Sequence, residues 1–323
     1  MTQQIDPITI AAPAYAVLTQ GAALLAQPHA GVLQLTDADR ADFLHRMTSN
    51  NIIALRPGQS AVTVLTSPTA RILYVFTVVC RTDDLLLLPA PGQTAALARH
   101  LRGQIFFMDK VKVQDLSEQW TRLRLVGPQA ERSLTPLGLD AAPVPNTWTQ
   151  AGAVLALAQP DYGVPGYELL VPAGQAQAMT AALTAGGAQL IDDDAYHVRR
   201  VELGRPAPGA ELVEDYNPLE AGLGWACSDN KGCYTGQEII ARQLTYDKVT
   251  KTLVGLTGAE AFHPGDEITV DGRGVGVVTS AALSPSMGPL ALAVVKRPHN
   301  TPGLTGIVGG QTVTIAALPF AAA

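Results

Sequence analysis

The order in which helix-like and strand-like stretches follow one another constrains the fold of this chain most. An expected helix, with Thr36 as its N-cap and an acid three residues later, carries Phe43, Leu44 and Met47 on its apolar side. Strand-like runs and a second helix follow, at residues 61–66, 71–80, 84–88 and 94–101. A similar order returns, with extended runs at 122–126, 154–158 and 167–171 and helical runs at 129–134 and 175–183. The sequence therefore predicts two related α+β halves, over residues 1–116 and 117–250.

The pattern of the sequence changes after Lys251. Short β-rich runs separated by glycine and proline turns lie at residues 253–257, 267–270, 275–279, 290–295 and 312–316. Asp271-Gly272 suits the tight turn of a hairpin, so turns and strand packing explain the glycines at 272, 274 and 276 better than a phosphate loop does. We therefore expect residues 251–323 to form a small β-barrel.

Composition narrows the class of protein and its compartment. At 323 residues with 47% hydrophobic positions, the chain can bury a substantial core in two or three domains. Its net charge of −6 argues against a general nucleic-acid binder, which needs a cationic surface. No apolar run approaches the roughly 18 to 20 residues of a membrane-spanning helix, and the first residues lack the pattern of a secretion signal or a transit peptide. We therefore expect no membrane segment, no direct nucleic-acid partner and a cytoplasmic location.

Cys233 lies in the stretch of sequence that carries the most chemistry. Gly232 and Gly236 bracket it in an expected loop, and from Gln237 onward the residues favour a helix. The unpaired N–H groups at the start of that helix, together with the ammonium group of Lys231, would stabilise a thiolate and lower the pKa of Cys233. Cys233 and Lys231 are therefore the candidate catalytic residues.

A less specific interpretation fits the same residues and remains open. The two glycines would only shape a turn, and Cys233 would be a small buried hydrophobic residue, which is the commoner fate of a free cysteine. Cys80 and Cys227 are expected in packed segments, and two thiols cannot complete a zinc or iron–sulfur site, which takes about four ligands. The histidines considered as ligands are scattered without ligand spacing, at His45, His197 and His263. We therefore expect no bound metal.

Residues 231–238, K-G-C-Y-T-G-Q-E, resemble the K-G-C-[FY]-x-G-Q-E signature of the YgfZ family. Upstream, residues 216–223, Y-N-P-L-E-A-G-L, are similar to the N-P-x-E-A-G-L lead-in of that family, and residues 199–202 resemble the arginine-containing helix before it. These motifs follow one another in the same order as in the family. The likeness extends over most of the chain, including residues 43–58, and is weak outside the motifs.

The YgfZ family is related to the T protein of the glycine cleavage system. The resemblance implies two ferredoxin-like α+β domains that form a folate cleft, plus a C-terminal β-barrel. Residues 163–168, G-V-P-G-Y-E, look like the region in which the related aminomethyltransferases place a pterin-contacting glutamate, so Glu168 is the candidate, unless it is a surface strand residue. A carboxylate can accept paired hydrogen bonds from the pterin amine and ring N–H. Tetrahydrofolate or a derivative is the implied cofactor, and the other implied folate contacts are Arg200, Tyr234, Gln237 and Glu238.

The resemblance implies a tetrahydrofolate-binding protein that acts in iron–sulfur cluster assembly or repair through Cys233, with iron–sulfur client or assembly proteins as partners. One difference separates this sequence from the aminomethyltransferases. Those enzymes have an Asp-containing segment that helps to activate the folate. The corresponding residues 71–76 contain no carboxylate, so the group expected to handle a proton is missing. A tetrahydrofolate-dependent aminomethyltransferase is therefore the alternative. A non-catalytic folate-binding scaffold, in which Cys233 only packs, is the second alternative.

Overall fold

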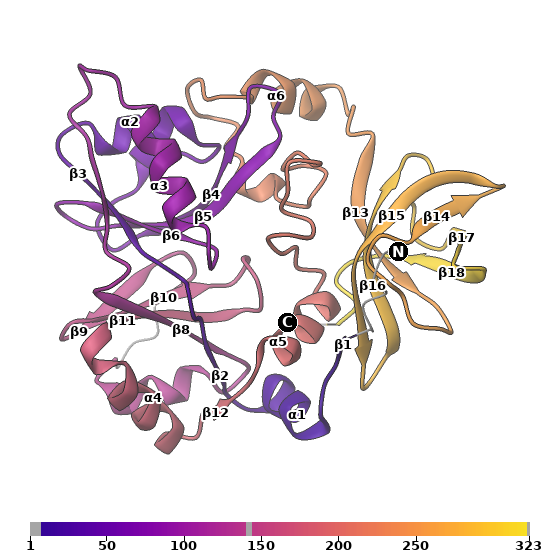
Figure 1. The fold of residues 1–323 in the computed structure, drawn as a ribbon, viewed down its shortest axis with the longest axis horizontal. Helices are drawn as coiled ribbons and strands as arrows, with labels where there is room; N and C mark the ends of the chain where they lie inside the picture. Colours follow the sequence, from indigo (N-terminus) through magenta and orange to yellow (C-terminus); the bar gives the residue numbers. More distant parts are fainter. Residues whose placement is uncertain (1–7, 140–143, 322–323) are drawn as a thin grey trace.

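The strands within the described part of the chain form three sheets. The structure is a computed structural model that describes residues 8–139 and 144–321. Two sheets lie one above the other and form, with their helices, the two-sheet region on the left of Figure 1, while the third closes into the barrel on the right. Within the described residues, no helix is long and apolar enough to cross a membrane. The predicted fold, two α+β halves and a C-terminal β-barrel, is confirmed.

The first sheet is antiparallel and has the strand order β4-β5-β6-β3-β7. Its strands are β3 (Leu33–Thr36), β4 (Ser60–Thr66), β5 (Ile72–Cys80), β6 (Leu85–Pro89) and β7 (Lys112–Asp115). One face is covered by α2 (Arg40–Met47), α3 (Thr94–Gly103) and the 3-10 turn η1 (Ile52–Ala54). Phe43 of α2 and Leu97 and Leu101 of α3 are fully buried there, because residues four apart lie on one side of a helix.

The second sheet has the strand order β12-β2-β8-β11-β10-β9. Its strands are β2 (Ala23–Ala26), β8 (Trp120–Val126), β9 (Trp148–Ala151), β10 (Val154–Gln159), β11 (Gly166–Pro172) and β12 (Gln189–Leu190). The helix α4 (Ala176–Ala185) packs on its outer face, and the short turns are η2 (Glu131–Ser133), η3 (Thr135–Leu137) and η4 (Ala173–Gln175). The domain boundaries at residues 116 and 250 stay a prediction. Strand β2 lies in the first predicted half of the chain, but it pairs with β8 and is therefore part of the second sheet.

The inner faces of the two sheets pack directly against each other. Val79 and Leu88 of the first sheet share a buried cluster with Leu155, Leu157 and Leu170 of the second. Because side chains alternate between the faces of a strand, Gln159, two residues after Leu157 in β10, and Glu168, two residues before Leu170 in β11, also face inward. The character of this inner face changes along the strands from aliphatic to polar, and the polar end borders the candidate functional site.

The barrel consists of six strands and is closed, because β15 pairs with both β14 and β16. Its strands are β13 (Lys251–Thr257), β14 (Glu267–Val270), β15 (Arg273–Ser284), β16 (Gly288–Lys296), β17 (Thr305–Val308) and β18 (Gln311–Ala316). Asp271 and Gly272 have positive φ angles of 50° and 72°, as the predicted two-residue hairpin turn requires. The short strand β1 (Ile8–Thr9) adds to the barrel, parallel to β15.

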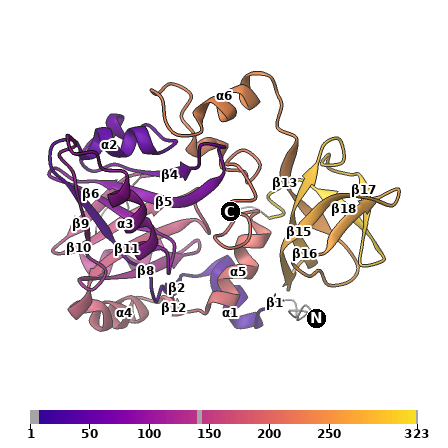
Figure 2. The same cartoon turned by 45° about the horizontal axis from the view of Figure 1, so that its top comes forward.

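Helix α5 (Asp193–Glu202) lies between the two-sheet region and the barrel, and α1 (Ala12–Gln20) packs beside it. Figure 2 shows α6 (Gln237–Thr245) on the connection from the two-sheet region to β13, after the short turn η5 (Gly224–Ala226). Buried ion pairs fasten this junction. Glu211 is fully buried, lies 3.3 Å from Arg200 of α5 and accepts hydrogen bonds from Ser280 and Thr279 of β15.

Two sequence-based predictions of local structure need correction, and several short strands were missed. The N-cap of α2 is Asp39 rather than Thr36, because Asp37 adopts a positive φ of 76° and delays the helix to Arg40. The helix expected at 129–134 is a 3-10 turn over Glu131–Ser133. The sequence analysis did not predict the strands β1, β2, β3, β7, β9, β12 and β17, each of which has at most four residues.

The Glu211 junction leads to a first prediction. Glu211→Gln leaves the guanidinium of Arg200 buried without its ionic partner, which should lower the free energy of unfolding by about 3 to 5 kcal/mol. Urea unfolding followed by circular dichroism measures the change. The control is Glu267→Gln on the exposed surface of the barrel, which should change stability by less than about 0.5 kcal/mol. Equal stability of the two variants would contradict the importance of this junction.

Candidate functional site

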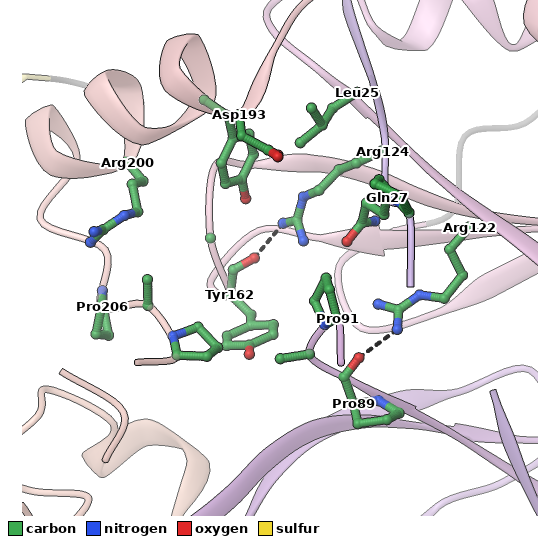
Figure 3. A pocket seen from close by; sticks show the side chains of 16 residues that line it. Leu25, Gln27, Pro89, Pro91, Arg122, Arg124, Tyr162, Asp193, Arg200 and Pro206 are labelled. Carbon is green, nitrogen blue, oxygen red and sulfur yellow. Dashed lines mark hydrogen bonds between the residues drawn. The ribbon is translucent and has the colours of Figure 1, made fainter. Parts of the chain in front are cut away.

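A cavity of about 200 Å³ opens beside the polar end of the inner face of the second sheet. Its walls are mostly apolar and include Tyr162, Pro89, Pro91 and Pro206 (Figure 3). The ring of Tyr196 also lines it. Its polar lining residues are Gln27, Arg122, Arg124, Asp193 and Arg200. A flat ring with hydrogen-bonding groups on one edge suits such a mixture of surfaces.

The floor of the cavity is built by the alternation of β8 and β11. Arg122 and Arg124 are two residues apart, so they project from the same face of β8, and both are about 5% exposed. Glu168 stands opposite Arg124 in the register of β8 and β11 and is fully buried. A buried carboxylate is stable only with close partners, and here the two guanidinium groups provide them.

Glu168 does not line the cavity itself. Its Oε1 accepts hydrogen bonds from Gln27 Nε2 at 2.8 Å and from Arg122 Nε at 2.6 Å. Its Oε2 lies 3.7 Å from Arg124 Nη1 and has no hydrogen-bond partner among the described residues. The structure therefore places the predicted pterin-contacting glutamate one layer behind Gln27, Arg122 and Arg124, which do line the cavity.

Arg124 is held mainly by neutral acceptors. Its guanidinium donates to Gln159 Oε1 at 3.0 Å and to the carbonyl oxygens of Tyr162 and Val164. It lies 5.6 Å from the centre of the Tyr196 ring. Burial raises the pKa of Tyr162 to about 12, so this phenol stays neutral in the wall of the cavity.

Arg200, predicted to contact the folate, does line the cavity, but its hydrogen bonds are directed to the protein. Besides Glu211, it donates to Arg205 O at 3.0 Å and to Ser280 Oγ at 2.7 Å. Burial lowers the pKa of Arg200, and the carboxylate of Glu211 opposes that effect. Arg200 therefore stabilises the junction between α5 and the barrel, and it also borders the cavity.

Cys233 is exposed on a loop that ends at α6, which begins at Gln237 as predicted. Gly236 has a φ of 82°, and a Cβ there would come within 2.7 Å of Ser67 O, so this position requires glycine. The hydroxyl of Thr66 also donates to Thr235 O and ties the loop to β4. Cys233 is not among the residues that line the cavity, so the thiol and the cavity are separate features.

Lys231 is directed towards α2. Its ammonium donates to the carbonyl oxygens of His45 and Thr48, at the C-terminal end of that helix, and to Asn50 O at 2.9 Å. It also lies 4.9 Å from the centre of the Tyr234 ring. Burial lowers the pKa of Lys231 to about 8, while the last carbonyls of a helix attract a cation. Lys231 thus fixes one side of the cysteine loop, and its predicted activation of Cys233 stays a prediction.

The remaining predicted folate contacts lie on the α6 side of the molecule. Tyr234 is buried and, with Gln237 and Cys227, borders a second hollow of about 150 Å³. Burial raises the pKa of Cys227 to about 11. Glu238 is exposed and pairs with Arg242 at 3.1 Å. None of Tyr234, Gln237 and Glu238 lines the cavity that contains Arg122 and Arg124.

The sequence analysis did not identify Gln27, Arg122 and Arg124. The two arginines carried a signal, because they alternate with leucines in an otherwise apolar strand and therefore face a core that has to accommodate charge. Gln27 gave no signal, since it lies just beyond a short strand without a recognisable motif. No group of three or more His, Cys, Asp or Glu side chains within the described ranges could hold a metal ion.

Comparison with known families covers nearly the whole chain. The model of the GCVT N-terminal domain matches residues 9–231, and that of the glycine cleavage T-protein C-terminal barrel domain matches residues 251–320. The chain is 33% identical to the "Putative transferase At1g60990, chloroplastic" of Arabidopsis thaliana, over 87% of this chain and 67% of that protein. It is 31% identical to the aminomethyltransferase of Herpetosiphon aurantiacus, over 86% of this chain and 79% of that enzyme.

A solved structure shows the same fold. The glycine cleavage system aminomethyltransferase T of Bartonella henselae superposes with a TM-score of 0.87, at 22% identity, over 96% of this chain and 89% of that one. At this level of identity the superposition supports the architecture alone. The sequence matches carry the family assignment: the chain belongs to the family of the glycine cleavage T protein, the aminomethyltransferase superfamily, which binds tetrahydrofolate.

Proposed function

We propose that this protein is a YgfZ-type member of the family, which binds a reduced folate and acts in the assembly or repair of iron–sulfur clusters through Cys233. The observation that carries the proposal is the exposure of Cys233 at the centre of a loop whose two ends are fixed. A thiol presented in this way can reach a partner protein. The expectation of a cytoplasmic location belongs to the same proposal.

The residues of the cavity fit a reduced folate. Its volume and apolar walls suit a pterin ring, and Arg124, which lines it, has a buried Nε without a hydrogen-bond partner among the described residues. Gln27, Arg122 and Arg124 would hold the ring. When bound, tetrahydrofolate supplies a nitrogen that carries or accepts a one-carbon unit. The chain contributes shape, hydrogen bonds and exclusion of water around that ring.

An aminomethyltransferase is the alternative, favoured by the names of several relatives. Residues 71–76 remain without a carboxylate, and Arg71 in that segment contacts Glu220 at 3.3 Å, so its charge is directed to the protein. Assaying ammonia release from an aminomethylated lipoyl carrier protein with tetrahydrofolate separates the two functions. The proposal expects no release above background, and turnover at a rate typical of enzymes would establish the alternative.

The three cysteines should differ in reactivity. Burial raises the pKa values of Cys80 and Cys227, so at pH 8 their thiolate fractions are small and their sulfur atoms are shielded. Iodoacetamide should therefore alkylate Cys233 first, as peptide mass spectrometry would show. In urea all three should react at similar rates, which is the control. Equal labelling of Cys227 and Cys233 in the native protein would contradict the exposure of this loop.

Folate binding should raise the thermal stability of the protein. A ligand at 100 times its Kd adds about 2.7 kcal/mol, which raises the melting temperature by several degrees. Differential scanning fluorimetry with tetrahydrofolate and its formyl derivative measures the shift. Cys233→Ser should show the same shift as the wild type, because Cys233 does not line the cavity. The absence of any shift with either folate would refute the folate part of the proposal.

The role of Cys233 can be tested in cells that lack their own YgfZ-type protein. Cys233→Ser should fold, bind folate and fail to restore the activity of an iron–sulfur client enzyme. Cys80→Ser should restore the activity if its stability permits, and measured protein levels provide the control. Full rescue by Cys233→Ser would instead support a folate-binding scaffold in which the thiol has no chemical part.

A further inference from the structure

We propose that Lys231 is a positioning residue for Cys233. Its ammonium group fills a nest of backbone carbonyl oxygens at the end of α2 and thereby fixes the place at which the thiol is presented. The inference rests on the role proposed above for Cys233. It assigns to Lys231 an action through the position of the loop, in place of a direct action of its charge on the sulfur atom.

The end of α2 lacks a C-cap of its own. The last four carbonyl groups of a helix have no partner within it, and many helices satisfy them with a glycine in the left-handed conformation. The chain leaves α2 through Thr48, whose φ of −129° and ψ of 162° are extended, and no glycine follows directly. The Thr48 hydroxyl donates to Leu44 O. The carbonyl of His45, one residue later, receives its donor from Lys231, far along the chain.

The ammonium group of Lys231 is fully used by the carbonyl nest. It has three N–H donors, and it donates to His45 O, Thr48 O and, at 2.9 Å, Asn50 O. Burial lowers the pKa of Lys231 only to about 8, so the charged form predominates at neutral pH. The negative end of the α2 dipole favours this charge. With three carbonyl oxygens bound, no donor remains for the sulfur atom two residues away.

The other side of the thiol is fixed independently. Tyr234 is buried and packs against α6, and Thr66 donates to Thr235 O. Gly232 contributes no side chain, so the nearest side-chain anchor before Cys233 is that of Lys231. The exposed thiol therefore lies between two anchors, and the carbonyl nest is one of them.

Two roles of Lys231 predict different results when its ammonium is removed. If its charge acts on the sulfur atom, the reaction of Cys233 with an alkylating reagent slows and the loop keeps its place. If the ammonium is an anchor, the loop becomes mobile, while a thiol that is already exposed to water reacts at a similar rate. A vacated nest of carbonyl oxygens can be refilled by a cation only if that cation carries N–H donors.

The test is electron paramagnetic resonance of the full-length protein with a nitroxide spin label on Cys233, which is the exposed cysteine. Lys231→Ala should shorten the rotational correlation time of the label by about two- to fivefold, because loops without anchors move on the nanosecond scale. Propylammonium, which replaces the missing part of the side chain, should restore the wild-type spectrum. Tetramethylammonium has the same charge but no N–H group and should not restore it.

The matched control is Lys251→Ala. Lys251 also lies over a tyrosine ring, 4.6 Å from the centre of Tyr216, and donates to a backbone carbonyl, Asp215 O at 3.2 Å. It makes no contact with the cysteine loop among those that the structure describes, so the label should keep its wild-type mobility. The rate at which iodoacetamide alkylates unlabelled Cys233 at pH 7 should stay within about twofold of the wild type in both variants.

Three results would overturn the inference. Unchanged mobility of the label in Lys231→Ala would remove the anchor, and alkylation slowed by about tenfold or more would show that Lys231 acts on the thiol by its charge. Equal restoration by tetramethylammonium would mean that hydrogen bonds to the nest are not needed. If circular dichroism shows that Lys231→Ala does not fold, Lys231→Met keeps the apolar stem over Tyr234, and a label as immobile as in the wild type would then contradict the inference.

These measurements involve neither folate nor an iron–sulfur client. Loss of the anchor would therefore be seen even if the function proposed for Cys233 were refuted, and failure of the anchor would leave that function standing. A rescue assay in cells joins the two, since Lys231→Ala should lower the activity of the client enzyme and Lys251→Ala should not.

Discussion

The burial of Glu168 between two arginines is the interaction around which the functional part of the molecule is organised. The two sheets meet through aliphatic side chains over most of their contact, and at one end the same inner face carries Arg122, Arg124 and Glu168. Burying these charges costs free energy that close pairing has to offset. The arrangement therefore tolerates little displacement of β8 relative to β11, and it holds the surface of the cavity rigid. Rigidity at the floor of a cavity is what selective recognition of a small ring requires.

The alternation and length of apolar runs were sufficient to predict the longer strands of both sheets and of the barrel, whereas strands of four residues or fewer were mostly missed. Strand β5 was expected at 71–80 and is observed at Ile72–Cys80, because β-branched residues dominate it. What the sequence could not supply was the partner of each strand. The pairing of β2 with β8 joins residues far apart in the chain, and no local pattern encodes it. The N-cap of α2 was misplaced because Asp37 takes a left-handed conformation that residue preferences alone do not reveal.

For the candidate site, the sequence predicted the loop that carries Cys233 and the start of α6 at Gln237, but not the directions of the side chains. Cys233 is exposed on the loop before α6, as a reactive thiol requires. Lys231 was expected to act on Cys233, whereas its ammonium caps the carbonyl end of α2, a contact between segments 180 or more residues apart. Such a contact depends on tertiary packing. The same holds for Gln27, whose importance arises only from the carboxylate that orients its amide.

The positions of β1 and β2 have a consequence for the order of assembly. Ile8 in β1 lies beside Ala282 of the barrel, while β2 is held between β8 and β12, and α1 connects the two strands. During synthesis these residues emerge early, yet the surfaces that receive them exist only after much later segments have folded. Pairings of such long sequence separation form slowly, because a large loop must close before any contact is gained. Residues 8–26 are therefore among the last to find their place, although they are made before the barrel, and they join the barrel to the rest of the molecule.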